Sequence, residues 1–575
     1  MTVSVRRLSS VSRLRSSVAG RRSPVVTHQM TDFEVYGLVI VAMALCFANW
    51  RTGVFICVLV GFLQDPVRKL VTGEPIFFTA LVGAPLAMTL LGAHLRKVRI
   101  SFRPLHAWNS VLRMPLNLFI LLVGIQSVAA IIKTGNPVIG GIGALSYLAP
   151  LPAILLGYQF SRSEREITKL IKVYLTVGVL MVAGIYLSYA GFDWKVLKSV
   201  GVGLFIYSLE KGRLDLYPGF LRSPEIAAWH AAACVCLFIV LSLSIRRNTV
   251  FKWSSGVLVM FLLGALLLTG RRKFLVEIVL FVSIYALLLI WFRRTAIKSA
   301  VISKSAILLA AGLILGSVGY MYIASDEAAT EILPYYERGM SVRNDVTERV
   351  SVMTVDSFEL VIAQNGILGS GAGTGSQGTQ QFGGGANLVG GAAEGGLGKV
   401  LAELGVPGLL LLLWLVISLG RYMWAIAKDI AQAKDVDPSL GKLVFGLEAF
   451  LITNGFVFVI AHQVFGDPFV LIVLGFFIGF VMAMPKMVMR NADDRRRATD
   501  DRRRATDERA ETEDRRATTG DRRRTTGDGT PSPVSSVRGQ RSEVRSQKSD
   551  VRSQRSDVRS QRSDVRIDVW RSSDL

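Results

Sequence analysis

The chain carries little charge for its length. Asp, Glu, Lys and Arg make up 19% of its 575 residues, whereas hydrophobic residues make up 51% and the mean hydropathy is +0.42. These values do not fit a soluble globular protein, and several apolar runs reach the length of about 20 residues that a helix needs to cross a bilayer. Short alternating segments, which a β-barrel requires, are missing. The predicted fold class is therefore an all-α polytopic membrane protein.

Cysteine is also scarce. The four cysteines lie in apolar runs, and Cys234 and Cys236 lack both the CxxC spacing and the partner pair of a metal site. We therefore expect neither a disulfide framework nor a cysteine metal centre.

Both ends of the chain lack the composition of a packed domain. Residues 1–30 contain no acidic residue and are rich in Arg and Ser, as in an organellar presequence or a basic cytoplasmic tail. No apolar core with a cleavage site follows promptly, so we interpret them as a disordered cytoplasmic tail.

Residues 489–575 repeat DRRRATD and then SDVRSQR. The latter unit has one apolar residue per heptad and cannot form a coiled-coil seam, so a disordered tail is expected. Its basic character would suit anionic lipids, but a solvated repeat without function is favoured.

The apolar runs predict twelve membrane spans. They cover residues 33–50, 75–94, 114–133, 137–158, 170–190, 225–245, 253–270, 274–293, 304–323, 398–419, 443–463 and 469–487. Residues 53–64 form a further apolar piece of about a dozen residues, which is too short for an easy crossing. We predict that it is re-entrant or interfacial.

The loop charges predict the orientation. Five basic loops fall on one side if residues 53–64 do not cross, and the positive-inside rule makes that side cytoplasmic, with both termini inside. The net charge of +23 then lies mainly in these loops and in the tails, and does not indicate a nucleic-acid partner. The membrane domain would comprise residues 31–323, with about nine spans and an outer loop at 191–224, and residues 398–488, with three spans. Between them lies a large periplasmic loop, residues 324–397, which is too long for a simple connector.

Three clusters of basic residues break the charge rule on the outer side. They are Arg213 and Arg222 in the first outer loop, Arg271, Arg272 and Lys273 in an outer turn, and Arg338, Arg343 and Arg349 in the large loop. Ion pairs with Asp215, Glu225, Glu337 or Glu348 would explain them. Alternatively, guanidinium forks suit a phosphate or pyrophosphate, and this explanation is stronger for the turn because charge between two helices is expensive without a partner.

The large loop holds a glycine-rich segment and the carboxylate of Glu394, and a second carboxylate, Glu403, follows in the next helix. Gly369–Gly375 (GSGAGTG) lacks the GK[ST] ending of a nucleotide loop, so we expect a tight turn packed at the membrane surface. Glu394 lies at the mouth of the next helix, where it would act as a general base or simply favour the helix N-terminus. Glu403 lies inside that apolar helix, where it would be functional or would pair with an arginine and fix helix packing. His230 and His462 are expected to be packing residues.

Taken together, three passages resemble the bacterial O-antigen ligase/polymerase family of integral membrane glycosyltransferases, over roughly residues 115–485. The first passage, GFLRSPEIAAWH (219–230), is similar to the family's Gly-x4-Pro-Asn segment, with Glu225 in place of asparagine. The second passage, LTGRRKFLVEIVLF (268–281), is similar to the family's Gly-Ser-Arg-Gly turn, with Arg272 at the position of the arginine. The third passage begins at ERVSVMTVDSFEL and ends at EGGLGKVLAELG, and it resembles the Arg…Gly-x-Gly…Glu-x-Gly pattern. The third passage aligns Arg349, Gly369, Gly371, Glu403, Gly405 and Gly408. Glu394 stands where ligases have a histidine, which favours a polymerase-like member.

The resemblance implies glycosyl transfer from an undecaprenyl-pyrophosphate-linked glycan at the outer face of the bacterial inner membrane. Glu394 and Arg272 would be catalytic, and the substrate-binding residues would be Arg213, Arg222, Arg271, Arg349 and Glu403. The acceptor would be a glycan or a lipid-linked glycan, and other polysaccharide-assembly proteins are possible partners. No Asp-x-Asp motif lies at the outer face, so no metal or other cofactor is expected. A ligase proper, a transporter or lipid flippase, and a scaffold whose tail recruits partners are the alternatives.

Overall fold

A computed structural model describes most of the chain. It covers residues 32–98, 100, 110–200, 205–208, 212–244, 249–292, 333–340, 357–375, 395–433, 436–460 and 462–524. These residues belong to two compact units, the first within residues 1–104 and 111–488 and the second within residues 105–110 and 489–575. Each unit is described by itself below.

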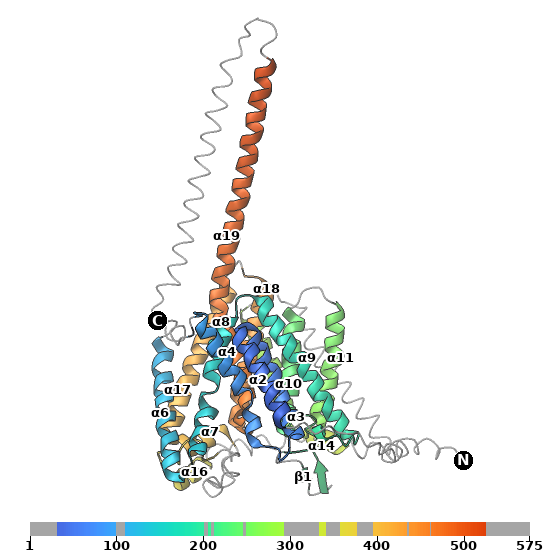
Figure 1. Cartoon of the computed structure of the whole chain (residues 1–575), viewed down its shortest axis with the longest axis vertical. Helices are drawn as coiled ribbons and strands as arrows, with labels where there is room; N and C mark the ends of the chain where they lie inside the picture. Colours follow the sequence, from blue (N-terminus) through green and yellow to red (C-terminus); the bar gives the residue numbers. More distant parts are fainter. Residues whose placement is uncertain are drawn as a thin grey trace, which may run out of the picture. The chain divides into compact units, whose positions relative to one another are not determined.

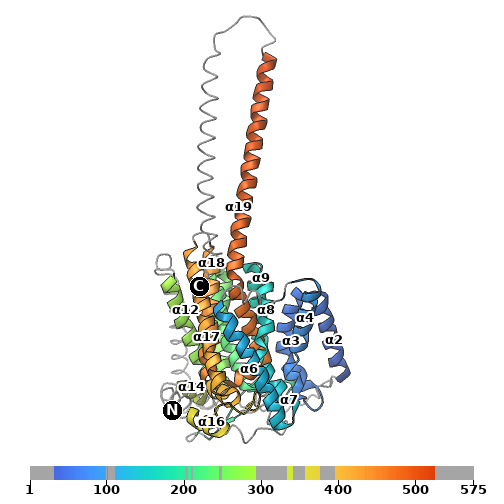
Figure 2. The same ribbon diagram turned by 90° about the vertical axis from the view of Figure 1, so that its left-hand side faces the viewer.

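The first unit is built almost entirely of helices (Figures 1 and 2). In chain order, its elements are α2 (Asp32–Ala48), α3 (Trp50–Leu70), η1 (Ile76–Ala80), α4 (Gly83–Leu95), α6 (Ser110–Thr134), α7 (Pro137–Leu148), α8 (Pro150–Phe160), α9 (Glu164–Tyr189), η2 (Lys195–Leu197), β1 (Phe205–Ser208), β2 (Gly212–Asp215), α10 (Pro224–Ser244), α11 (Thr249–Leu268), α12 (Lys273–Phe292), α14 (Leu333–Met340), α16 (Ser357–Asn365), α17 (Gly396–Gln432), α18 (Pro438–Ile460), η6 (His462–Gly466) and the first part of α19 (Pro468–Arg524). The two strands form an antiparallel hairpin that pairs Phe205 with Asp215.

Among the described residues, nine helices are long and apolar enough to cross a membrane. They are Ile76–Leu95, Leu112–Thr134, Pro137–Phe160, Glu164–Tyr189, Pro224–Ser244, Lys273–Phe292, Gly396–Gln432, Pro438–Ile460 and Pro468–Arg490. Two shorter apolar helices, Phe33–Ala48 and Ser254–Leu268, coincide with further predicted spans. The predicted span 304–323 lies outside the described residues, so the helical membrane fold is supported and the count of twelve stays a prediction.

The helices of the first unit end at two opposite faces. We call one the hairpin face, because it carries the β1–β2 hairpin, the turn at residues 269–272 and η6. Helix α14 packs there, since Tyr335 donates a hydrogen bond to the Asp215 carbonyl (2.6 Å) and the Arg338 Nε donates one to the Gly270 carbonyl (3.1 Å). The other is the basic face, which carries the loops after α4 and α8. The predicted outer loop 191–224 and the outer turn therefore share one face, as expected.

Helix α3 is longer than the sequence suggested. It has 21 residues, or roughly 31 Å at 1.5 Å per residue, which matches the hydrocarbon core of a bilayer. Its first turn lies at the basic face, where Arg51 pairs with Glu166 (2.5 Å), and its last turn contacts Arg222 at the hairpin face through Asp65. Residues 53–64 are therefore part of a longer helix, which is not among the described helices that are apolar enough to cross a membrane, so the re-entrant or interfacial placement stays a prediction.

This longer helix changes where the membrane domain begins. Only Asn49 separates α2 from α3, and its side chain caps the start of α3, so the two helices form an antiparallel pair. The start of α2 consequently lies at the hairpin face, where Val35 packs with Val71 and Phe78. The expectation that the first span starts at the face of the basic loops is wrong. The predicted cytoplasmic tail, residues 1–30, lies outside the described residues.

Helix α10 is the buried centre of the first unit. Nearly all of its residues are buried, and it packs against α9, α11, α12 and α18. Its sequence, PEIAAWHAAACVC, is rich in alanine, and small side chains allow neighbouring helices to approach closely. The start of α10 is therefore held by contacts from several parts of the chain.

The second unit contains the end of α19. The helix continues to Arg524, so the expectation of a tail that is disordered from residue 489 is not met over residues 489–524. Asp500 and Arg504 stand four residues apart, a spacing at which opposite charges support a helix. Residues 525–575 lie outside the described residues.

Candidate functional site

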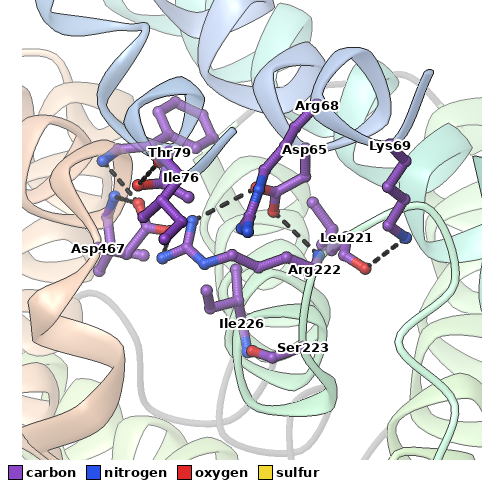
Figure 3. A network of polar contacts seen from close by, with 12 residues as sticks. Asp65, Arg68, Lys69, Ile76, Thr79, Leu221, Arg222, Ser223, Ile226 and Asp467 are labelled. Atoms are coloured by element: carbon purple, nitrogen blue, oxygen red, sulfur yellow. Dashed lines mark hydrogen bonds and ion pairs between the residues drawn. The ribbon is translucent and has the colours of Figure 1, made fainter. Parts of the chain in front are cut away.

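The start of α10 is fixed by a buried ion network (Figure 3). One nitrogen of the Arg222 guanidinium lies 2.7 Å from the Asp467 carboxylate and another lies 3.4 Å from that of Asp65. The backbone N–H of Arg222 also donates a hydrogen bond to Asp65 (3.0 Å). The side chains of Asp65 and Asp467 are 2% and 1% exposed. The network thus joins α3, α10 and the residue that precedes α19.

The surroundings of Arg222 keep it charged. Burial alone would lower the pKa of its guanidinium, but the carboxylates of Asp467 and Asp65 outweigh that effect and raise the pKa above its usual value. Both arms of the fork are occupied by protein carboxylates. We therefore assign Arg222 a positioning role, and the sequence-based prediction that it binds substrate is not supported by its contacts.

Lys69 fastens the turn that precedes α10. Its buried ammonium donates three hydrogen bonds, to the carbonyls of Val196 (3.0 Å), Gly219 (2.9 Å) and Leu221 (2.8 Å). An ammonium has three donors, so Lys69 is saturated by backbone oxygens. A single lysine on α3 therefore holds the two ends of the outer loop together.

Cations from the turn between α11 and α12 gather on Glu225, in the first turn of α10. The Arg271 Nε lies 3.0 Å from the Glu225 carboxylate, and the Lys273 ammonium contacts its other oxygen. Burial lowers the pKa of Arg271, but an arginine remains charged in proteins. Arg272, between them in the sequence, is half-buried, and its carbonyl accepts the Leu275 N–H (3.0 Å) at the start of α12. Arg271, Arg272, Lys273 and Glu225 are called the α10 cation cluster below.

Arg213 lies apart from this cluster on the exposed hairpin. Its Nε is 2.8 Å from the carboxylate of Asp215, and both side chains are 58% exposed. Its guanidinium carbon also lies 4.6 Å from the ring centroid of Phe205. The ion pair with Asp215, one of the two explanations weighed from the sequence, is therefore present.

The glycine-rich segment caps a break in helix α17. Gly405 adopts φ +71° and interrupts the helix, and Pro407 follows it. The carbonyls of Ala402 and Glu403 accept hydrogen bonds from the N–H groups of Ser370 (2.8 Å) and Gly371 (3.1 Å). A side chain on Gly405 would strike the Ile367 carbonyl, because a Cβ there would lie 2.4 Å from it. The predicted tight turn is thus a structural element of the membrane domain.

Glu403 lies in this break and is completely buried. Its carboxylate accepts hydrogen bonds from the Tyr147 hydroxyl (2.7 Å) and the Gly375 N–H (2.9 Å). Among the described residues no arginine pairs with it, and a pairing with Arg343 or Arg349 stays a prediction because both lie outside the described residues. The Lys399 ammonium, one turn earlier on α17, lies 5.7 Å from the Tyr147 ring centroid. Glu403 joins α17 to α7 and to the end of the glycine-rich segment.

The structure therefore brings together only part of the predicted site. Arg271 contacts Glu225 and Arg272 is its neighbour in the same turn, Arg222 lies three residues before Glu225, and Glu403 belongs to a separate polar group at the hairpin face. Glu394 and Arg349 lie outside the described residues, so their predicted roles are untested. Within the described residues no three His, Cys, Asp or Glu side chains are placed to hold a metal ion.

Sequence reasoning missed Asp65, Lys69 and Asp467. Asp65 and Lys69 stand in LQDPVRKL, directly after the apolar piece that was treated as too short to cross. The charges at its end were a usable signal, because charge near a membrane helix requires a partner. Comparison of the chain with protein-family models finds no match, and comparison with curated proteins finds none either.

Proposed function

We propose that the protein is a membrane glycosyltransferase that uses an undecaprenyl-pyrophosphate-linked glycan at the hairpin face, either to polymerise repeat units or to transfer them to another acceptor. The observation that carries the proposal is the α10 cation cluster. Arg271 and Lys273 converge on Glu225, beside Arg272, at the N-terminus of a buried helix. A helix N-terminus and oriented guanidinium groups both favour phosphate anions.

In this proposal Glu225 orders the cations before the donor binds. Its carboxylate holds Arg271 and Lys273 side by side, so little freedom is lost when the pyrophosphate arrives. Arg222, Asp65 and Asp467 fix the start of α10 from the other side. The glycosyl C1–O bond then breaks, the acceptor oxygen forms the new glycosidic bond, and the cations stabilise the charge that develops on the leaving pyrophosphate.

The acceptor side of the reaction rests on the resemblance. Glu394 would take the proton from the acceptor hydroxyl, and Arg349 and the glycine-rich segment would shape the cleft. Because Glu403 accepts bonds from Tyr147 and Gly375, its role here is to hold that segment against α17. The enzyme would lie in the inner membrane, with the hairpin face on the periplasmic side.

A deletion strain tests the proposal. Its lipid-linked glycans should accumulate as single repeat units, and its surface polysaccharide should be lost on gels. Wild type should restore the polymer and Arg272→Ala should not, because loss of a group that stabilises developing charge costs about 10²- to 10³-fold in rate. Arg421→Ala, an exposed arginine near the basic face, is the matched control and should restore it.

Two outcomes would separate the alternatives. Unchanged polysaccharide in the deletion strain would refute the glycosyltransferase proposal. Long polymer that remains on the lipid carrier would show that the step lost is transfer to a final acceptor, which is the ligase reaction. Immunoblots of the membrane fraction must show equal amounts of each variant.

A further inference from the structure

Three helices bring polar side chains together inside the bundle, away from the α10 cation cluster. Glu277 lies on α12, Asn454 on α18 and Trp229 on α10, and their exposed fractions are 1%, 3% and 0%. The Trp229 indole N–H donates to the Asn454 side-chain oxygen (2.8 Å), and the Asn454 amide donates to Glu277 Oε1 (3.4 Å). The same amide donates to the Phe450 carbonyl (2.9 Å). The three side chains thus form a chain of hydrogen bonds that ends on a carboxyl group.

The carboxyl group of Glu277 is poorly compensated. Its Oε2 is buried and has no hydrogen-bond partner within the described residues, and no Arg or Lys of that part of the chain forms an ion pair with it. Lys273, one turn earlier on α12, contacts Glu225 instead. Within the described residues, the one donor to Glu277 is therefore a neutral amide, at the long end of the hydrogen-bond range.

We propose that Glu277, Asn454 and Trp229 form a proton-binding site in the membrane interior, with the Glu277 carboxyl as the group that takes up the proton. An ionised carboxylate without a cation costs several kcal/mol in such surroundings, and ionisable residues inside membrane bundles mark proton or ion sites. A bound proton removes that charge and gives Oε2 a hydrogen. Asn454 donates to Oε1 in either state, so the site persists when the proton leaves.

The groups that face Glu277 leave the proton as the natural ligand. Around it, α10 contributes Cys236 and α9 contributes Tyr174, whose hydroxyl hydrogen-bonds to His230 Nδ1 (2.8 Å) beside Phe62 and Trp229. On α12 itself, Tyr285 donates to the Lys442 carbonyl (2.9 Å). Helix α17 has no titratable residue between Glu403 and Arg421. Thiols, phenols and a histidine supply no permanent positive charge.

Helix α18 contributes a second buried acid, Glu448. It is 2% exposed, and its Oε1 has no hydrogen-bond partner within the described residues. It stands six residues before Asn454, about 9 Å along the helix axis toward the basic face. A second acid without a cation repeats the chemistry of Glu277 at another depth, so we expect it to carry a proton as well.

Carbodiimide labelling of the purified full-length protein tests the site. Dicyclohexylcarbodiimide is an apolar reagent that reacts with protonated carboxyl groups, and mass spectrometry of the peptides identifies the modified residue. Glu277 should be labelled near neutral pH, and labelling should fall at least tenfold as the pH is raised and the proton leaves. Glu359 on α16, an exposed acid, is the matched control and should remain unmodified.

Variants sharpen the test. Glu277→Gln should abolish the label on that peptide and leave the label on Glu448. Asn454→Ala should move the loss of labelling to higher pH, because the ionised carboxylate loses its one donor. A folded wild-type protein that leaves Glu277 unlabelled, or labels it equally at every pH, would overturn the proposal. Protection by Na⁺ but not by K⁺ at equal ionic strength would also overturn it, since the site would then bind a metal cation. The labelling of the wild-type protein tests the proposal even if a variant fails to fold.

Discussion

The Arg222 network and the Glu277 site solve the same problem in opposite ways. Both bury carboxylates almost completely, since Asp65, Asp467 and Glu277 are at most 2% exposed. At the hairpin face the two aspartates share Arg222, whereas Glu277 meets only the amide of Asn454. The first arrangement keeps three charges in place, and in the second, as proposed above, a proton on the acid removes the uncompensated charge.

The presence or absence of a pairing cation distinguishes charges that stabilise the fold from an acid that we propose binds a proton. A fully paired network joins α3 to the start of α10 and to the residue before α19, three segments distant in the sequence. Breaking such a network costs more than it contributes, because the remaining charges lose their partner. A carboxyl group without a cation contributes little to packing and is retained where its proton matters. Substitutions that change charge should therefore act differently at the two places.

The largest effect should follow from Arg222→Ala. It leaves two buried carboxylates without a cation, and we expect the free energy of unfolding to fall by about 3–5 kcal/mol. Unfolding of the purified protein in mixed detergent micelles measures it. The triple variant Arg222→Leu, Asp65→Asn, Asp467→Asn is the control and should recover most of the loss. A triple variant no more stable than the single one would show that the charges themselves are needed.

Lys69→Met should have the next largest effect. Methionine preserves the length of the side chain but leaves three buried carbonyls without their donor, and an unsatisfied buried polar group costs about 1–3 kcal/mol. Partial relaxation of the loop should limit the total to about 2 kcal/mol. The same unfolding measurement applies, with the exposed Lys428→Met on α17 as the matched control. If both variants change the free energy of unfolding equally, Lys69 does not stabilise the turn before α10.

Glu277→Gln should change stability by less than about 1 kcal/mol. Glutamine matches the size of a protonated glutamate and keeps an acceptor for the Asn454 amide, and polar groups whose bonds are preserved cost little. The unfolding midpoint in detergent measures this, beside Asp467→Asn, which removes a charge from an ion pair and should be clearly worse. Equal losses in the two variants would break the comparison, because Glu277 would then behave as a paired charge.

The smallest effect should follow from Arg213→Ala. Its ion pair with Asp215 is more than half exposed, and exposed pairs contribute about 0–1 kcal/mol. The unfolding midpoint should therefore remain unchanged within error. If Arg213 binds the pyrophosphate, this variant should instead weaken polymer formation in the complementation assay without a loss of stability, which separates the substrate-binding prediction from a structural role.

Much of the helical arrangement could be predicted, because long apolar runs report membrane helices directly. The loop at 191–224 and the turn at 269–272 were correctly expected at one face. The length of helix α3 was underestimated because Arg51, Asp65 and Lys69 limit its apolar run, and their partners lie in α9 and in the loop before α10. Whether a charged residue ends a membrane helix depends on its ion-pair or hydrogen-bond partner, which the local sequence does not give.

The candidate site was predicted less completely. Arg271 and Arg272 were singled out because cations in a predicted outer turn oppose the charge rule, and Glu225, which was weighed as a partner, does contact Arg271. The contacts of Arg222 could not be anticipated, since Asp65 and Asp467 are separated from it by 157 and 245 positions in the sequence. Tyr147 and Gly375 likewise reach Glu403 only through the folding of α7 and α17.

The glycine-rich segment shows which properties follow from the sequence and which depend on the tertiary structure. The sequence by itself determined that this is a helical membrane protein, that Gly369–Gly375 forms a turn and not a nucleotide loop, and that the loop at 191–224 and the turn at 269–272 share one face. These properties depend on local composition and on spacing along the chain. The tertiary structure decided that the turn caps the break at Gly405, that Arg222 is held by two aspartates and that Glu277 lacks a cation. Burial and charge pairing are relations between distant segments, so they exist only once the helices have packed.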